Sequence, residues 1–190
     1  MNDERHSATT ATINTFPIRV LVIMGVSGCG KSAVGRAVAD VCQADFHDAD
    51  DWHSPKAVAK MAAGHALTDE DRTPWLLRLH DEVVAATPAE GRTVLACSAL
   101  RRRYREALRF GEEGVQFVYL SGTKELIAAR MARRSGHYMP ASLLDSQFAA
   151  LEVPGLEEAL TVSIDQPLEA VAAEVLVIVQ CWPTVDTVGA

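Results

Sequence analysis

Short apolar runs alternate with longer segments of mixed polarity along this chain of 190 residues. Five runs are interpreted as strands, and they lie near residues 20–24, 44–48, 93–97, 115–120 and 160–164. In the segments between them apolar residues recur three and four positions apart, which is typical of amphipathic helices. Strands that alternate with helices predict an α/β fold with a parallel sheet covered on both faces.

The segment between the second and third strands has room for two helices. Ser54 and Pro55 predict the start of the first helix, as N-cap and first-turn proline, and Gly64 predicts its end. Thr73 and Pro74 predict the start of the second helix by the same reasoning. We expect this insertion to form a helical flap over a substrate.

A second insertion follows the fourth strand. Residues 123–134 are expected to be helical with Leu126 and Ile127 inward, and residues 135–138 break this helix before another begins near Pro140. Such a break is typical of the hinge of a lid. A last amphipathic helix over residues 167–180 completes one domain of residues 18–180, between a disordered N-terminal tail at 1–17 and a loose C-terminal tail at 181–190.

Composition narrows the class of protein. With 48% hydrophobic and 23% charged residues the chain is an ordinary globular protein, and its net charge of −7 argues against a general nucleic-acid or membrane binder. Cys29, Cys42, Cys97 and Cys181 have no paired spacing, which indicates reduced thiols. No apolar run reaches the length of about 18 residues that crosses a bilayer, and residues 1–17 lack a signal-peptide core. We therefore expect a cytoplasmic protein.

The first strand runs directly into a phosphate-binding pattern. It reads Gly25-Val26-Ser27-Gly28-Cys29-Gly30-Lys31-Ser32 and matches G-x-x-x-x-G-K-[ST]. The backbone N–H groups of such a loop hold phosphates, Lys31 reaches the β and γ phosphates, and the Ser32 hydroxyl binds Mg²⁺. Its place between a strand and a helix predicts a user of nucleoside triphosphates.

Acidic residues follow the second strand, at the edge where parallel sheets place their ligands. We assign Asp48 to the hydrated Mg²⁺ and Asp50 to a substrate hydroxyl, whose proton it accepts. Two other interpretations stay open, a solvated acidic turn and a transition-metal site with His47 and His53.

Several basic residues are placed to meet anions. The Arg72 guanidinium suits a substrate carboxylate, and Arg101, with Ser98, follows the third strand into the same region. Arg130 and Arg134 lie one turn apart on the expected lid, where they can stabilise a migrating phosphoryl group. Trp75 is expected in the core.

The combined motifs resemble those of the gluconokinases. The resemblance rests on the phosphate loop, Asp48-Ala49-Asp50, the Asp-Arg-x-Pro-Trp-Leu of residues 71–76, Cys97-Ser98-Ala99-Leu100, Arg134-x-Gly136-His137 and Asp165-Gln166-Pro167-Leu168. It implies a three-layer P-loop kinase fold of the shikimate-kinase-like branch, with sheet order 2-3-1-4-5. It further implies transfer of a phosphoryl group from ATP, with Mg²⁺, to the alcohol group of D-gluconate, which gives 6-phospho-D-gluconate, and a homodimer.

The same resemblance implies roles for individual residues. Gluconate would be surrounded by Asp50, Arg72, His137 and Gln147, the phosphates by Arg130 and Arg134, and the adenine edge by Gln166 and Pro167. Lys31, Asp50 and Arg130 would carry the catalysis. Cys29 stands where the family more usually has serine, which suggests sensitivity to thiol oxidants, and Met139 replaces an aromatic residue of the lid.

Two alternatives remain open at this point. One is a P-loop kinase of another small hydroxy acid such as shikimate, although Ser98-Ala99-Leu100 is not the glycine-rich turn that would let a ring lie on the backbone. The other is a non-catalytic nucleotide-binding switch, although the chain lacks the N-K-x-D and D-x-x-G segments of such proteins.

Overall fold

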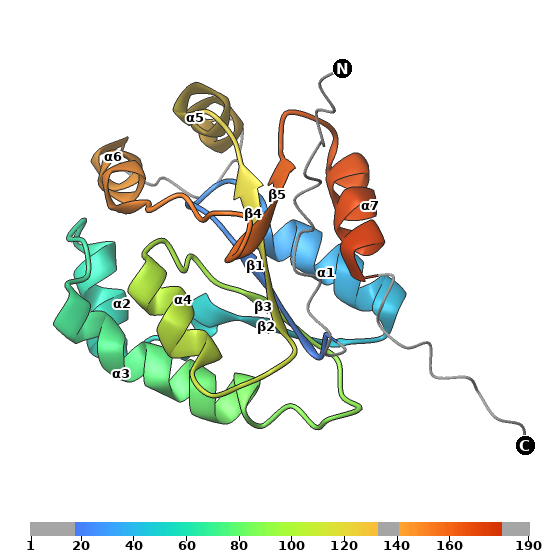
Figure 1. Ribbon diagram of the computed structural model, residues 1–190. Helices are drawn as coiled ribbons and strands as arrows, with labels where there is room; N and C mark the ends of the chain where they lie inside the picture. The colour runs from blue at the N-terminus through green and yellow to red at the C-terminus, as the bar shows by residue number, and fades with distance from the viewer. Residues whose placement is uncertain (1–17, 133–140, 180–190) are drawn as a thin grey trace, which may run out of the picture.

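A five-stranded parallel sheet forms the centre of the molecule (Figure 1). The computed structural model describes residues 18–132 and 141–179. Its strands are β1 Val20–Met24, β2 Asp45–Asp48, β3 Thr93–Ala96, β4 Val115–Ser121 and β5 Ala159–Ser163, in the order β2-β3-β1-β4-β5. The expected α/β fold and strand order are confirmed, and each strand agrees with its expected bounds to within one residue at either end.

Helices cover both faces of the sheet. They are α1 Lys31–Cys42, α2 Pro55–Ala62, α3 Asp69–Leu79, α4 Arg102–Arg109, α5 Lys124–Ala132, α6 Ala141–Ala150 and α7 Leu168–Ile178. α1 and α7 lie against one face, α3 and α4 lie against the other, and α5 and α6 lie beyond the tips of β4 and β5 (Figure 1). A 3₁₀ turn, Ala49–Trp52, connects β2 to α2, and a π-helical turn, His80–Val84, extends α3.

The core is divided by the sheet into two layers. β1 is fully buried, and its side chains alternate between the faces as the two-residue period of a strand requires. Leu21 and Ile23 join the cluster under α1 and α7, whereas Val22 and Met24 join the cluster under α3 and α4. Burial on both faces explains why this strand reads as a continuous apolar run.

The start of α3 differs from the sequence-based prediction. The helix begins at Asp69 and not at Thr73, because Thr68 accepts a hydrogen bond from the Asp71 N–H while the Asp71 carboxylate accepts one from the Thr68 N–H. This reciprocal capping box satisfies two N–H groups that a helix start leaves unpaired. Pro74 therefore lies inside the helix, and Trp75 is buried in the core as expected.

The flap is otherwise formed as predicted. Ser54 caps α2 by accepting a hydrogen bond from the Ala57 N–H, Pro55 is its first residue, and Gly64 follows its end with a positive φ of 80°. Of the two residues expected inward on α5, Ile127 is fully buried and Leu126 packs on the core. The predicted hinge at residues 135–138 and the tails at 1–17 and 181–190 lie outside the described residues.

Candidate active site

The loop of residues 25–30 wraps the amino end of α1 and has the backbone that an anion cradle needs. Gly25, Gly28 and Gly30 have φ angles of 142°, 83° and 104°, a region that favours glycine. At Gly28 a Cβ atom would come within 2.6 Å of Met131 Cγ, so any other residue there would also have to displace the Met131 side chain. Gly30 caps α1 without a side-chain hydrogen bond, which leaves the first N–H groups of the helix for an anion.

The side chains of Lys31 and Ser32 connect this loop to its surroundings. Lys31 Nζ donates to the Val26 carbonyl oxygen at 3.1 Å, so the ammonium group lies over the loop. Ser32 Oγ donates to Asp48 Oδ2 at 2.6 Å, and Asp48 Oδ1 accepts from the Asp50 N–H at 3.2 Å. A hydroxyl beside a carboxylate is a set of hard oxygen donors that fits Mg²⁺ bound together with phosphates.

Asp50 lies in the 3₁₀ turn directly after β2, and its side chain is 85% exposed. Its position relative to the loop is fixed by Asp48, which accepts hydrogen bonds from both the Asp50 N–H and the Ser32 hydroxyl. The thiol of Cys97 is fully buried after the end of β3. Burial raises the pKa of Cys97 to about 12, and Asp50, Lys31 and Arg72 all add electrostatic contributions to it. Through Asp48 the turn that carries Asp50 is held against the first turn of α1, so the phosphate cradle and Asp50 lie in the same region.

Two arginines expected near the substrate, Arg72 and Arg101, lie around the ring of Tyr104. The guanidinium carbons of Arg72 and Arg101 are 5.7 Å and 6.0 Å from the centre of this ring. Arg101 Nη1 also pairs with Asp69 Oδ2 at 3.3 Å, and Asp69 accepts further hydrogen bonds from the Tyr104 hydroxyl and from Arg103. The bond from Tyr104 is the main reason why the pKa of Asp69 lies below its ordinary value.

Ser98 contacts the loop through its backbone. Its carbonyl oxygen accepts a hydrogen bond from the Gly25 N–H at 3.3 Å. This bond joins the end of β3 to the first glycine of the cradle.

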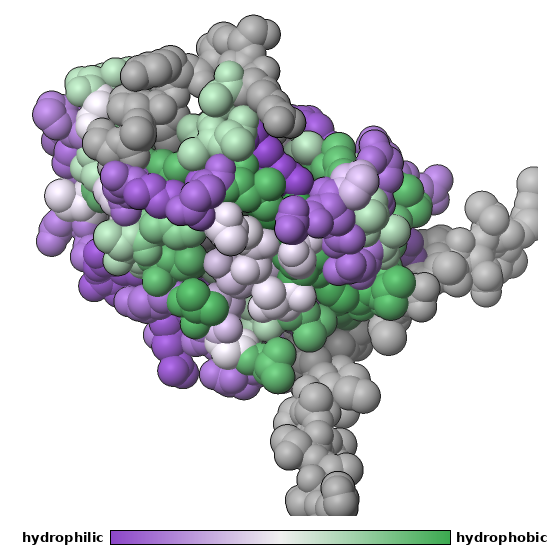
Figure 2. All heavy atoms as spheres, turned by 90° about the horizontal axis from the view of Figure 1, so that it is seen from above, coloured by the Kyte–Doolittle hydropathy of each residue, from purple (hydrophilic) through white to green (hydrophobic). Residues whose placement is uncertain are grey.

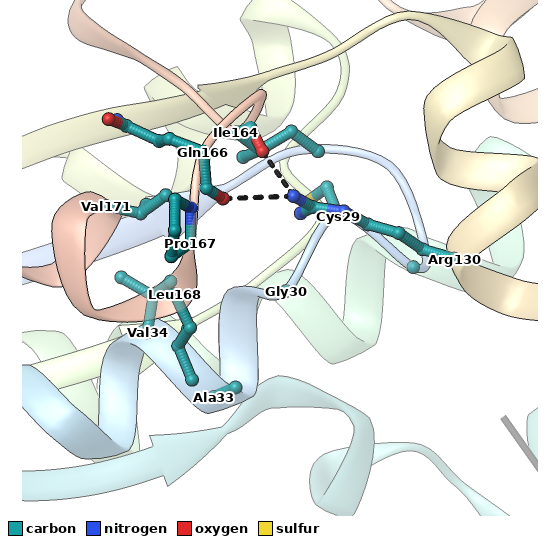
Figure 3. Close-up of a pocket in the computed structure, with 11 residues that line it drawn as sticks. Cys29, Gly30, Ala33, Val34, Arg130, Ile164, Gln166, Pro167, Leu168 and Val171 are labelled. Atoms are coloured by element: carbon teal, nitrogen blue, oxygen red, sulfur yellow. Dashed lines mark hydrogen bonds between the residues drawn. The ribbon is translucent and has the colours of Figure 1, made fainter. Parts of the chain in front are cut away.

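A pocket of about 190 Å³ opens between the loop, α1 and the start of α7 (Figure 3). Ala33, Pro167 and Leu168 give it apolar walls. Arg130 reaches in from α5 and donates to the carbonyl oxygens of Ile164 and of Gln166, the latter at 3.1 Å. Arg130, Gln166 and Pro167, which the sequence predicts to bind the nucleotide, line this one pocket, and the Arg130 guanidinium lies on the 164–166 turn.

Gln147 was expected near a substrate, and the structure places it on the phosphate loop. The Ser27 N–H donates to Gln147 Oε1 at 2.6 Å, and Gln147 Nε2 donates to Ser27 Oγ at 3.0 Å. Helix α6 is thereby bonded to the cradle, and an ion pair between Lys124 and Asp145 joins it to α5. Arg134 and His137, the other residues expected on the lid, lie outside the described residues.

Cys29 is inside the loop and is 1% exposed. Its pKa is raised, mainly by burial and against the opposing charge of Lys31, so the reactive thiolate is scarce. This conformation gives no support to the oxidant sensitivity suggested by the sequence.

Within residues 18–132 and 141–179 no group of three or more His, Cys, Asp or Glu side chains is arranged to hold a metal ion. None of the helices in this part of the chain is long and apolar enough to cross a membrane.

Figure 2 views the molecule from the end at which α5 and α6 lie, and hydrophilic and hydrophobic residues are intermixed over this face.

Sequence reasoning missed the interactions of His53, Tyr104 and Asp69. The sequence suggests only a metal-ligand role for His53 and gives no role to Tyr104. Their positions were the available signal. His53 closely follows the acidic turn, and Tyr104 lies within the arginine run of residues 101–109 (Arg101, Arg102, Arg103, Arg105 and Arg109).

The strand order, the glycine cradle after β1 and the acidic turn after β2 define the class of P-loop phosphotransferases that act on small molecules. The model of the shikimate kinase family matches residues 27–176. A shikimate kinase from Acinetobacter baumannii has the same fold, with a TM-score of 0.57 at 20% identity, over 87% of this chain and 94% of that one.

Proteins named gluconokinases are more similar to this chain than that shikimate kinase is. The thermoresistant gluconokinase of Escherichia coli is 41% identical over 163 residues, which are 85% of this chain and 93% of that protein. The gluconokinase of Gluconobacter oxydans is 47% identical over 140 residues, 74% of this chain and 79% of that protein. A crystal structure of a gluconokinase from Sinorhizobium meliloti has a TM-score of 0.76 at 42% identity, over 85% of this chain and 91% of that one. This chain belongs to the gluconokinase family.

Proposed function

We propose that this protein transfers the γ-phosphoryl group of ATP to D-gluconate and so forms 6-phospho-D-gluconate. The relatives that are 41% and 47% identical are named gluconokinases. The structural observation that carries the proposal is the pair of hydrogen bonds by which Asp48 joins Ser32, next to the loop, to the Asp50 N–H. Helix α3, which contains Arg72, is bonded to the same turn through Trp75 Nε1 and the Ala49 carbonyl oxygen. A donor cradle, an acceptor carboxylate and a guanidinium in one region are the parts that a transfer between two small molecules needs.

The phosphate side of the site is supplied by the loop and by α1. Its N–H groups and Lys31 bind the phosphates of ATP, and the amino end of α1 favours their negative charge. Ser32 and Asp48 would hold Mg²⁺, which supplies positive charge against the charge on the phosphate oxygens. The apolar walls at Ala33, Pro167 and Leu168 are suited to the adenine ring.

The acceptor side is supplied by the turn after β2 and by the flap. Asp50 accepts the proton of the terminal hydroxyl of gluconate as the oxygen attacks the γ-phosphorus. Arg72 and Arg101, which flank the Tyr104 ring, bind the carboxylate of the sugar acid. We assign Arg130 and Arg134 to the migrating phosphoryl group, and Ser98 and His137 to the acceptor side. Gln147, which the sequence assigns to the acceptor, is bonded to Ser27, and we assign it to holding the phosphate loop.

We further infer, from the family resemblance, that the protein is a cytoplasmic homodimer. The net charge of −7 supports a small-molecule partner over nucleic acid. Light scattering coupled to size-exclusion chromatography tests the oligomeric state.

A panel of acceptors tests the function. Purified protein is incubated with Mg-ATP and with gluconate, other aldonates, shikimate or no acceptor. ADP release is followed by a coupled assay, and the product is identified by mass spectrometry. We expect fast ADP release with gluconate and a product heavier by one phosphoryl group. Preference for shikimate would point to another kinase, and slow hydrolysis independent of any acceptor would point to a switch.

The Asp50→Asn variant tests the proposed base. Removal of a general base is expected to lower kcat by about 10²- to 10⁴-fold, while the affinity for ATP stays close to that of the wild type. Glu90→Gln, which alters an exposed carboxylate outside the site, is the matched control. A near-normal kcat in Asp50→Asn would exclude Asp50 as the base.

A further inference from the structure

The imidazole of His53 lies behind the carboxylate of Asp50. His53 Nε2 is 3.9 Å from Asp50 Oδ1, and the backbone N–H of His53 donates to the Asp50 carbonyl oxygen at 3.4 Å. The two side chains differ sharply in exposure, since that of His53 is 4% exposed and that of Asp50 is 85% exposed. His53 therefore approaches the carboxylate from the protein side and leaves its open side to an acceptor.

The ring of His53 is fixed by the flap. It stacks on the indole of Trp75, with ring centres 4.4 Å apart and planes 17° from parallel. Trp75 Nε1 in turn donates to the carbonyl oxygen of Ala49 at 2.8 Å. Helix α3 thus holds the imidazole against the same turn that carries Asp50, and small rotations of the ring are restricted by packing.

The surroundings of the ring assign its proton. Burial lowers the pKa of His53, Arg72 lowers it further, and Asp50 opposes them in part, so the ring is neutral at neutral pH. A neutral imidazole donates through one nitrogen only. Nδ1 is buried and has no hydrogen-bond partner among residues 18–132 and 141–179, whereas Nε2 faces a carboxylate. The arrangement favours the tautomer with its proton on Nε2.

We propose that His53 is a positioning residue for Asp50, whose carboxylate it orients by donating Nε2–H to Oδ1. The observed 3.9 Å is longer than a hydrogen bond, and a rotation of the exposed Asp50 side chain closes it when an acceptor binds. Apo structures commonly show catalytic contacts that are long in this way. The inference rests on the proposed function, since it needs Asp50 to act as the base.

When His53 holds Asp50 Oδ1, the other carboxylate oxygen, Oδ2, is free to accept the proton of the acceptor. The acceptor O–H bond breaks and its proton moves to Oδ2, while the acceptor oxygen forms a bond to the γ-phosphorus. The bond from that phosphorus to the bridging oxygen breaks, and ADP leaves. His53 keeps its proton throughout. A carboxylate that is 85% exposed otherwise samples several rotamers, and holding one of them raises the fraction of complexes ready to react.

Three variants separate positioning from simple packing. His53→Phe keeps an aromatic ring on Trp75 and removes both nitrogens. His53→Gln places an amide nitrogen close to the position of Nε2, whereas His53→Asn places one close to Nδ1. His65→Phe, at an exposed position after α2, is the matched control. Each variant is checked by thermal unfolding and by ATP binding before its kinetics are measured with gluconate.

We expect kcat to fall about tenfold or more in His53→Phe and His53→Asn, with the KM for ATP within about twofold of the wild type. His53→Gln is expected to recover part of the loss, and His65→Phe to match the wild type. In an Asp50→Asn background, His53→Phe is expected to lower kcat little further, because the group that it orients is already disabled.

The inference is overturned if His53→Phe keeps the kcat of the wild type. It is also overturned if His53→Phe lowers kcat by the same factor in the Asp50→Asn background as in the wild-type background. Should His53→Phe not fold, equal kcat values for the Gln and Asn variants overturn it as well. A wild-type protein that does not phosphorylate gluconate contradicts the proposed function instead, so the two failures are distinguishable.

Discussion

The contact between Ser32 and Asp48 joins two segments that are remote in sequence. The hydroxyl belongs to the first turn of α1 and the carboxylate to the end of β2, and they meet at 2.6 Å. The same carboxylate accepts the Asp50 N–H, so one side chain links the proposed metal site to the turn that carries the proposed base.

The Ser32→Ala variant removes one of the two oxygen ligands proposed for Mg²⁺. We expect it to raise the Mg²⁺ concentration for half-maximal activity by about tenfold or more, since loss of a ligand weakens a small divalent site. The measurement is the initial rate at fixed ATP over a range of added Mg²⁺. Ser32→Thr, which keeps a hydroxyl, is the control and is expected to resemble the wild type. An unchanged Mg²⁺ dependence in Ser32→Ala would remove Ser32 from the site.

Single residues differ in how far the sequence specifies them. The proximity of Ser32 to Asp48 follows from two facts visible in the sequence, that the loop starts a helix and that both strands end at one edge of a parallel sheet. The contacts of His53 and Gln147 could not be derived in this way, because each depends on how a helix from another part of the chain packs. No local pattern encodes the stacking of His53 on Trp75.

Helix α3 has two sets of residues that could mark its start, and only one of them does so in the structure. Thr73-Pro74 has the residue types of a helix start, yet the helix begins five residues earlier than Pro74, at Asp69. Thr68 and Asp71 satisfy each other's N–H groups, and Lys60 of α2 pairs with Asp71 as well. The contact between Lys60 and Asp71 could not be predicted from the sequence, and it further stabilises the helix start at Asp69.

The charge on Asp71 makes the stability of the flap dependent on pH. The hydrogen bond from Lys60, followed by that from the Thr68 N–H, lowers the pKa of Asp71 to about 2. Because the folded pKa lies below the unfolded value of about 3.9, the stabilisation is complete above that value. It is lost as the pH falls toward 2.

Asp71→Asn is therefore expected to be less stable than the wild type at neutral pH, with a difference that shrinks below about pH 4. Urea unfolding at a series of pH values measures this difference. Glu90→Gln, outside α3, serves as the control and is expected to give no such convergence. A difference that stays constant down to pH 3 would contradict the assigned role of the Asp71 charge.

Arg105 connects distant parts of the whole molecule. Although it belongs to an arginine run that reads as a solvated helix face, its side chain is only 4% exposed. Its guanidinium donates to the carbonyl oxygens of Leu100 and Glu152 at 3.3 Å and 3.1 Å, and it pairs with Glu158. One side chain of α4 thus holds the turn after β3 against the segment that leads to β5.

Arg105→Leu is expected to lower the free energy of unfolding by about 3 kcal/mol, because several carbonyl groups lose their donor and Glu158 keeps only its more exposed partner, Arg102. Arg103→Leu, at a half-exposed position of the same run, is expected to cost less than about 1 kcal/mol. Urea unfolding of both variants at pH 7 gives the comparison. Equal losses would show that Arg105 has no special part in joining the two segments.

The overall architecture could be predicted from the sequence more completely than the contacts of Arg105. Alternation of apolar runs indicated the parallel sheet, and resemblance to a family supplied the order of its strands. The burial of one arginine among several identical neighbours could not be predicted, because it depends on where the helix lies against a segment about fifty residues away.

The two outer strands of the sheet differ in how they resist aggregation. β2 carries an aspartate at each end, whereas β5 reads Ala-Leu-Thr-Val-Ser and has no charge of its own. Uncharged outer strands are sites at which partly folded chains associate. Glu158 immediately before β5 and Asp165 shortly after it act as gatekeepers that oppose such growth. In the native state Glu158 is paired with Arg105. In an unfolded chain this pair is broken, and the charge of Glu158 is then available to oppose association of the strand.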